Sequence, residues 1–230
     1  LPETNALLER IKAMPQSSQG YASPDRARRR TNLFGRQEEY AWLLDQWKQV
    51  RQEHGRLTLV EGEMGIGKTR LVEEVLHQVG ASAALILRAR CHEFGQDLPY
   101  QPVADMLRMA LSKQPDLLKR ISAVWLPHLA NILPEVESSQ PPGKPAADPA
   151  RLAQNLTVLH LFEAVHQAFR ALIAPSSPPG ADPGPAGSGQ ARPSALRLVI
   201  FLDDLHWIDG ATVDLLRYVL HRLAELPVWL

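Results

Sequence analysis

The pattern of apolar and polar positions alternates between short apolar runs and longer amphipathic stretches. Apolar runs at 57–60, 83–87 and 196–202 have the length of β-strands. The last run is almost unbroken, which is typical of a strand covered on both faces in a parallel sheet. A further apolar run at 226–230 indicates another incoming strand. The pattern predicts an α/β fold with a parallel β-sheet flanked by helices.

The stretches between these runs have helical periodicity. It predicts helices at 4–11, 37–53, 70–76, 151–173 and 211–224, and two more within 103–133 that begin at Pro102 and are interrupted at Pro115 and Pro127. The inward faces of the two longest helices are predicted to be Tyr40, Leu43, Leu44 and Trp47, and Val158, Leu161, Phe162, Val165, Phe169 and Leu172. In the last helix the inward residues are Leu215, Leu216, Val219, Leu220 and Leu223.

Three polar segments interrupt this pattern. Residues 15–30 hold a basic cluster at Arg26–Arg30, which we interpret as a solvated linker rather than a nucleic-acid contact, because no aromatic residues are interleaved. Residues 138–149 are predicted to be a flexible loop. Residues 175–195 are rich in proline, glycine and serine, and hold too little apolar surface to offset the entropy of ordering, so we predict a disordered surface insertion.

Composition narrows the function classes only modestly. The 230 residues have a formal net charge of zero, so no global field attracts nucleic acid or a membrane. The single Cys91 cannot form an internal disulfide, which favours a reducing cytoplasm. No apolar run approaches the about 20 residues that span a bilayer, and we expect no membrane partner. The N-terminus has no signal-peptide pattern and does not begin with Met, so we expect an interior piece of a longer protein.

The segment 62–69 has the spacing G-x-x-x-x-G-K-T between a predicted strand and a predicted helix. Gly62, Gly65 and Gly67 permit backbone with φ > 0 and close approach to an anion. The amides of such a loop and of the following helix N-terminus form a phosphate cradle. Lys68 can reach the outer phosphates, and the Thr69 hydroxyl can ligate Mg²⁺. The flanking elements make a chance glycine-rich turn the poorer interpretation.

A pair of carboxylates, Asp203 and Asp204, directly follows the 196–202 run. Open α/β sheets place their ligands at the carboxyl ends of strands. We expect Asp203 to hold Mg²⁺ and Asp204 to orient or deprotonate an attacking water. Asp209 is more simply an N-cap of the next helix than a catalytic group. His206 either senses phosphate or packs in the interior.

His160, Glu163 and His166 follow one another at spacings of three within the 151–173 helix. They suggest a metal site, but the H-E-x-x-H arrangement is absent. We therefore favour a solvated polar face for these three residues.

Four segments together carry a resemblance to a known family. They are 34–39 (FGRQEE), 62–69 (GEMGIGKT), 98–102 (LPYQP) and 201–209 (FLDDLHWID). In these segments the chain resembles the AAA-type ATPase module of STAND regulators, which include large ATP-binding LuxR-type activators and SARP-type transcriptional regulators. The resemblance covers 31–230. Residues 1–14 resemble the closing helix of the bacterial transcriptional activator domain that precedes the ATPase in SARP-type proteins.

The resemblance implies a P-loop NTPase fold, a three-layer sandwich that is incomplete at the C-terminus, and a nucleotide switch. ATP would favour an assembly-competent state, and hydrolysis to ADP would reset it. By resemblance Lys68, Thr69 and the adjoining Arg70 bind nucleotide with Mg²⁺, while Asp203 is the Walker B metal residue and Asp204 the catalytic acid, assisted by Lys68.

Two further features of the family bear on this chain. The motif Gly35-Arg36 opens the family's module near the nucleotide, although Arg36 could also be a surface residue. Many AAA-type ATPases have Glu at the position of Asp204, so we expect slow hydrolysis here. The family's sensor arginine and winged-helix lid would lie after Leu230.

The leading hypothesis is a cytoplasmic, ATP-binding and slowly hydrolysing switch module of a bacterial transcriptional regulator. The alternative is a non-hydrolysing, nucleotide-dependent scaffold. A GTPase is disfavoured because the N-K-x-D segment is absent, and a small-molecule kinase because no lid arginines follow the carboxylates. We expect self-association in the full-length protein, and DNA binding only through domains outside these residues.

Overall fold

A computed structural model describes residues 6, 9–10, 35–50, 55–81, 84–93, 99–139, 154–174 and 197–230. The predicted linker at 15–30 and the predicted insertion at 175–195 lie outside the described residues, as does the 138–149 loop from residue 140 onward. Residues 6, 9 and 10 are helical, within the helix predicted at 4–11. None of the described helices combines the length and apolar character that crossing a membrane requires.

The sheet of the described residues is parallel and has the order β1-β2-β3. Strand β1 is Ala84–Arg90, β2 is Arg197–Asp203 and β3 is Val228–Trp229. Strands β1 and β2 pair along their whole length, so that Ala84 lies opposite Arg197 and Arg90 lies opposite Asp203. The carboxyl ends of both strands therefore meet at one edge.

The structure has no regular strand at 57–60, where the sequence predicts one. A single parallel bridge joins Arg56 to Trp229, with hydrogen bonds from Arg56 N to Val228 O (2.8 Å) and from Leu230 N to Arg56 O (2.9 Å). Thr58 N donates to Leu230 O at 2.6 Å. Among the described residues, Thr58 is the last of this segment with a backbone hydrogen bond to the β3 region. The segment still runs beside β3 and leads directly into the 62–69 loop.

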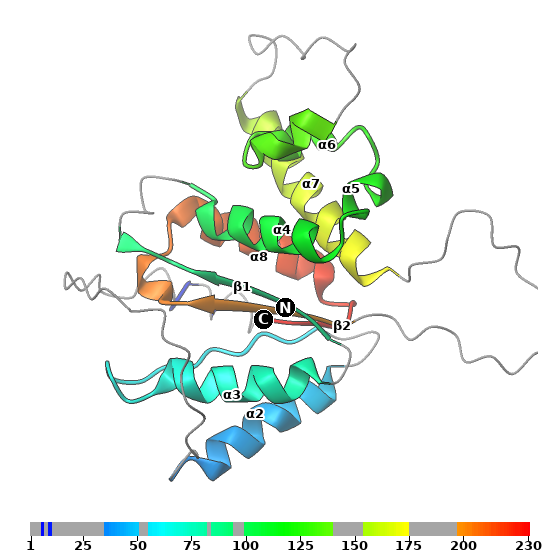
Figure 1. Ribbon diagram of the computed structural model, residues 1–230. Coiled ribbons are helices and arrows are strands. Elements are labelled where there is room, and N and C mark those ends of the chain that lie inside the picture. Colours follow the sequence, from blue (N-terminus) through cyan, green and yellow to red (C-terminus); the bar gives the residue numbers. More distant parts are fainter. Residues whose placement is uncertain are drawn as a thin grey trace, which may run out of the picture.

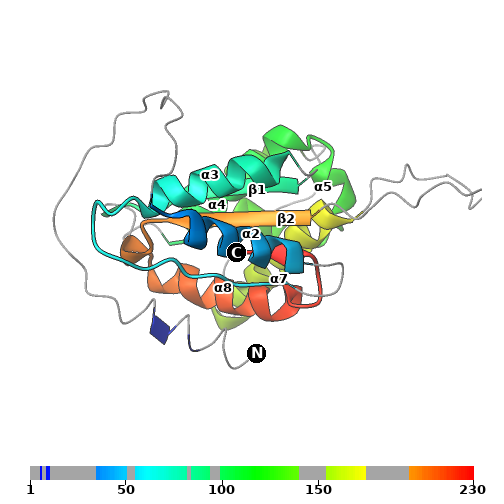
Figure 2. The same ribbon diagram turned by 90° about the horizontal axis from the view of Figure 1, so that it is seen from below.

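Helices cover both faces of the sheet (Figure 1). The α-helices are α2 (Gln37–Gln49), α3 (Lys68–Gly80), α4 (Gln101–Lys113), α5 (Leu117–Arg120), α6 (Leu126–Ala130), α7 (Gln154–Ile173) and α8 (Gly210–Leu223), with 3₁₀ turns η2 (Pro134–Ser139) and η4 (Leu205–Trp207). Helices α2 and α3 lie on one face, and α4 and α8 lie on the other, beneath α5, α6 and α7. Figure 2 shows α3 and α8 running along opposite sides of β2.

The alternation of side chains along the strands divides the core between these faces. Leu85, Leu87 and Ala89 pack with α4, α7 and α8, whereas Val199 and Trp229 pack with α2 and α3. The rings of Trp47 and Trp229 stack with their centroids 6.0 Å apart, and this contact joins α2 to the sheet. The two-sided burial confirms the expectation of a sheet covered on both faces.

Three details of the helix predictions are wrong. Helix α2 ends at Gln49, before the predicted end at Glu53, because buried Val50 takes an extended backbone with ψ of 102°. Pro127 does not interrupt a helix but lies in the first turn of α6, where a missing amide costs no hydrogen bond. Val158 is 40% exposed rather than buried, although Leu161, Phe162, Val165, Phe169 and Leu172 are buried as predicted.

Candidate functional site

The glycine-rich loop turns sharply into α3. Gly65 and Gly67 have φ of 79° and 91°, in the left-handed region where a β-carbon is strained. Gly67 is the N-cap of α3, so the helix begins at Lys68. The first amides of a helix have no partner within it and carry its partial positive charge. The loop therefore directs several backbone donors toward one place.

Lys68 folds back over this loop. Its Nζ donates to Gly62 O at 2.8 Å and to Glu63 O at 2.9 Å. These bonds hold the ammonium group beside the backbone of the loop, close to the N-terminus of α3. The flexible lysine side chain therefore places its positive charge where an anion would bind.

The next residue of α3 contacts the end of β2. Thr69 Oγ1 donates to Asp203 Oδ1 at 3.0 Å, although 134 positions separate the two residues. Asp203 Oδ1 also accepts from Asp204 N at 3.1 Å. The hydroxyl and the carboxylate that the sequence analysis assigned to one metal ion are thus adjacent in space.

Arg90 is a site residue that the sequence analysis missed. Its Nη2 donates to Asp203 Oδ2 at 2.7 Å, and its Nε lies 3.5 Å from Asp204 Oδ2. The hydrogen bond to Asp203 raises the pKa of the Arg90 guanidinium, against the opposing effect of burial. The signal that could have found it is positional, because Arg90 ends the strand next to the one that ends in Asp203.

The residues after Asp203 have distinct conformations. Asp204 has φ of 56° and ψ of 46°, which is uncommon for a residue with a side chain. The ring centroids of His206 and Trp207 are 5.0 Å apart, and His206 also borders the cavity described next. Asp209 accepts from Thr212 N at 2.7 Å and is the N-cap of α8, as predicted.

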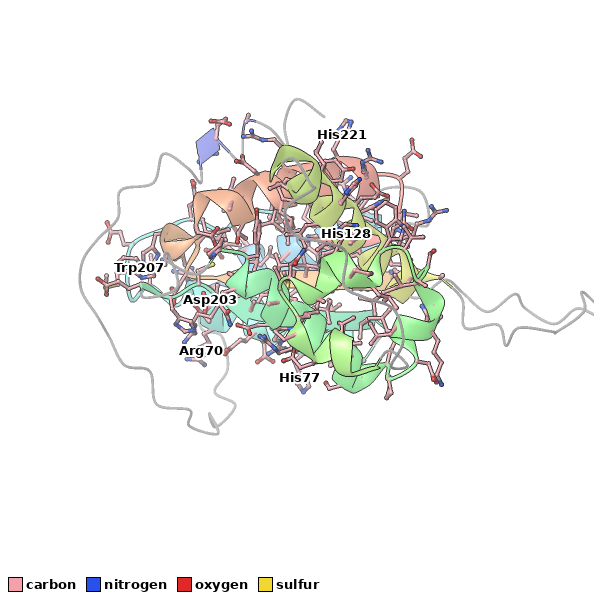
Figure 3. The ribbon with its side chains drawn as sticks, turned by 90° about the horizontal axis from the view of Figure 1, so that it is seen from above. Arg70, His77, His128, Asp203, Trp207 and His221 are labelled. Carbon is pink, nitrogen blue, oxygen red and sulfur yellow. The ribbon has the colours of Figure 1, made fainter. Side chains whose placement is uncertain are left out.

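A cavity of about 680 Å³ opens between the glycine-rich loop, α3 and the end of β2. This volume is within the about 300–1,000 Å³ typical of small-molecule and cofactor sites. Its lining includes the predicted site residues Gly62, Gly65, Gly67, Lys68, Thr69, Arg70, Asp203 and Asp204. Gly35 and Arg36 are described but do not line the cavity. Figure 3 shows Arg70, Asp203 and Trp207 toward one end of the molecule, away from His77, His128 and His221.

The solvated polar face predicted for His160, Glu163 and His166 is wrong. His166 is 7% exposed. Glu163 accepts from Gln167 Nε2 at 2.6 Å and from Tyr218 Oη at 2.8 Å, which ties α7 to α8. Within the described residues, no group of three or more His, Cys, Asp or Glu side chains is arranged to hold a metal ion. Glu163 is therefore part of the interface between α7 and α8, whereas the ring of His160 packs against that of His128 in α6, with centroids 4.8 Å apart.

Comparison with known proteins identifies the family of this chain. The model of the AAA ATPase domain family matches residues 32–230. The chain belongs to the AAA ATPase domain family. An uncharacterized protein of Rhizobium meliloti (strain 1021) is 26% identical over 209 residues, which cover 86% of this chain and 18% of that relative. The chain thus spans less than a fifth of that relative's length. No solved structure matches the chain.

Family and geometry agree on the class of fold and ligand. An AAA ATPase domain has a P-loop NTPase fold and binds nucleotide, and this AAA ATPase domain has the parallel sheet and covering helices of that class. Backbone donors and Lys68 favour a polyanion at the loop. The oxygens of Thr69 and Asp203 favour a hard divalent cation beside it.

Proposed function

We propose that this AAA ATPase domain is an ATP-binding, slowly hydrolysing switch module of a bacterial transcriptional regulator. The observation that carries the proposal is the contact of Thr69 Oγ1 with Asp203 Oδ1 at 3.0 Å, beside Lys68 and the glycine-rich loop. This contact joins residues from opposite halves of the chain at one cavity, which supports a phosphate cradle beside a metal-binding pair.

The residues present fit a magnesium ion. Mg²⁺ binds oxygens at about 2.0–2.1 Å in an octahedron, so two neighbouring ligands lie about 3 Å apart. Thr69 Oγ1 and Asp203 Oδ1 have this spacing. We propose that these two residues hold the ion. When bound, it would neutralise charge on the phosphate oxygens.

We propose roles for the remaining cavity residues on the same grounds. The phosphates are bound by the amides of the loop from Gly62 to Gly67 and by the side chains of Lys68 and Arg70. Lys68 also stabilises the negative charge that develops during phosphoryl transfer to water. Asp204 orients or deprotonates the attacking water. An aspartate reaches less far than a glutamate, so hydrolysis is slow. Gly35 and Arg36 lie outside the cavity lining. We propose that they contact nucleotide on one ground alone, which is that they match the family motif.

The regulator class and domain organisation are also proposed. The segments at 34–39, 98–102 and 201–209 support a STAND module of SARP or LuxR type, built as a three-layer sandwich over 31–230. Residues 1–14 would close a preceding helical domain, with 15–30 as linker and 175–195 as a disordered insertion. The full-length protein would act in the cytoplasm, self-associate with ATP or ADP bound, and contact DNA through other domains.

The test measures MgATP binding by isothermal titration calorimetry with wild type, Lys68→Ala and Lys48→Ala. Lys48 is an exposed lysine of α2 and serves as the matched control. We expect at least about tenfold weaker binding for Lys68→Ala, the scale of a charge-assisted hydrogen bond, and wild-type affinity for Lys48→Ala. Equal affinity for all three proteins would contradict the phosphate-binding role.

One observation favours a second function, a nucleotide-dependent scaffold without hydrolysis. The Asp204 carboxylate lies 3.5 Å from the Arg90 guanidinium, and a neighbouring positive charge makes a carboxylate a weaker proton acceptor. If the scaffold is right, Asp204→Asn leaves assembly and transcriptional output of the full-length protein unchanged. If turnover matters, this variant is trapped in the ATP state and its output changes.

A further inference from the structure

One guanidinium group contacts both carboxylates at the end of β2. Arg90 is the last residue of β1 and lies opposite Asp203 in the parallel register. Its Nη2 is 2.7 Å from Asp203 Oδ2, and its Nε is 3.5 Å from Asp204 Oδ2. Arginine presents its donors in a rigid planar fork, so the two contacts are geometrically linked.

The two oxygens of the Asp203 carboxylate have different partners. Oδ2 accepts from Arg90, whereas Oδ1 accepts from Thr69 Oγ1 at 3.0 Å. The terminal torsion of an aspartate is intrinsically broad, so a partner on each oxygen restricts rotation of the Asp203 carboxylate. Arg90 therefore keeps Oδ1 facing Thr69.

Two features of Asp204 are unfavourable and are offset by its neighbours. Its left-handed backbone is uncommon for a residue with a side chain. It also follows directly after another carboxylate, which repels it. The bond from Asp204 N to Asp203 Oδ1 (3.1 Å) and the Arg90 ion pair both oppose these effects.

We propose that Arg90 is a positioning residue for the Asp203–Asp204 pair, which holds Asp203 Oδ1 toward Thr69 and so presets the ligands of the divalent cation. This inference rests on the proposed MgATP site. Arg90 acts through the carboxylates, so its loss reduces the gain in ATP affinity that Mg²⁺ provides and not ATP binding as such.

The experiment compares ATP affinity in MgCl₂ with ATP affinity in EDTA, by calorimetry, and takes the ratio as the metal gain. The variants are Arg90→Lys, which keeps the charge and loses the fork, and Arg90→Gln, which keeps a planar donor if the lysine variant does not fold. Arg88→Lys is the matched control, because Arg88 is an exposed arginine of the same strand.

We expect the metal gain to fall about tenfold in both Arg90 variants, the scale of one charge-assisted hydrogen bond, and to stay at the wild-type value in Arg88→Lys. Affinity in EDTA should remain within about threefold of wild type for Arg90→Lys. A wild-type metal gain in Arg90→Lys, or an equal fall in MgCl₂ and EDTA, overturns the inference and leaves the proposed function intact. Failure of the wild type to bind ATP overturns both.

Discussion

Asp209→Ala is expected to destabilise the fold without removing any group that binds nucleotide. Asp209 precedes α8, and its two carboxylate oxygens accept from Thr212 N at 2.7 Å and from Thr212 Oγ1 at 2.5 Å. Asp209 is 9% exposed and Thr212 is fully buried. Water therefore cannot replace the lost acceptor at either donor.

The magnitude follows from these two bonds. Loss of an N-cap costs about 1 kcal/mol, and a buried hydroxyl without its partner costs about 1–3 kcal/mol. We expect Asp209→Ala to lower the free energy of unfolding by about 2–4 kcal/mol. Asp209→Asn keeps an acceptor for Thr212 N and a donor for the hydroxyl, so only the charge near the helix N-terminus is lost, about 1 kcal/mol or less.

The assay is urea unfolding at pH 7, followed by far-UV circular dichroism and linear extrapolation. Asp214→Ala, an exposed substitution about one turn inside the same helix end, serves as control and should stay within about 0.5 kcal/mol of wild type. The same proteins are assayed for ATP hydrolysis. Wild-type stability of Asp209→Ala combined with lost hydrolysis would refute the capping role and indicate a chemical one.

Three further predictions concern the rest of the fold. Burial favours protonation of Glu163, but hydrogen bonds from Gln167, Tyr218 and His166 outweigh it and lower its pKa, so its contribution to stability is lost as pH falls below about 4.5; Glu163→Gln should flatten that part of the stability–pH profile, and an unchanged profile would exclude the network. Burial raises the pKa of Cys91 to about 12, so iodoacetamide at pH 8 should label it only after unfolding, and rapid native labelling would contradict this. Phe169→Ala should cost about 3–5 kcal/mol of unfolding free energy, whereas Val124→Ala at an exposed site should cost less than about 0.5 kcal/mol; similar losses would contradict the assigned core.

Local patterns were sufficient for much of this protein. The apolar run before Asp204 locates β2, because a strand covered on both faces needs nearly continuous apolar residues, and the shorter run at 83–87 locates most of β1. The spacing of the 62–69 loop predicts a helix start at its end, because glycines at that spacing permit a left-handed turn. The capping role of Asp209 is likewise a matter of neighbouring residues.

Contacts between distant segments required the tertiary structure. A sequence places Arg90 and Asp203 at the ends of two strands, but only the register of β1 with β2 puts them side by side. Glu163 resembles a surface residue until α8 brings Tyr218 against it. The apolar run at 57–60 predicts a strand, but the structure joins this segment to β3 and Leu230 only through a bridge at Arg56 and a hydrogen bond at Thr58. The sequence alone determined the positions of the glycine-rich loop and of Asp203 and Asp204, since backbone propensity and burial act over a few residues. Only the fold placed Arg90 beside these carboxylates, since packing across the whole sheet decides which strands pair and in which register.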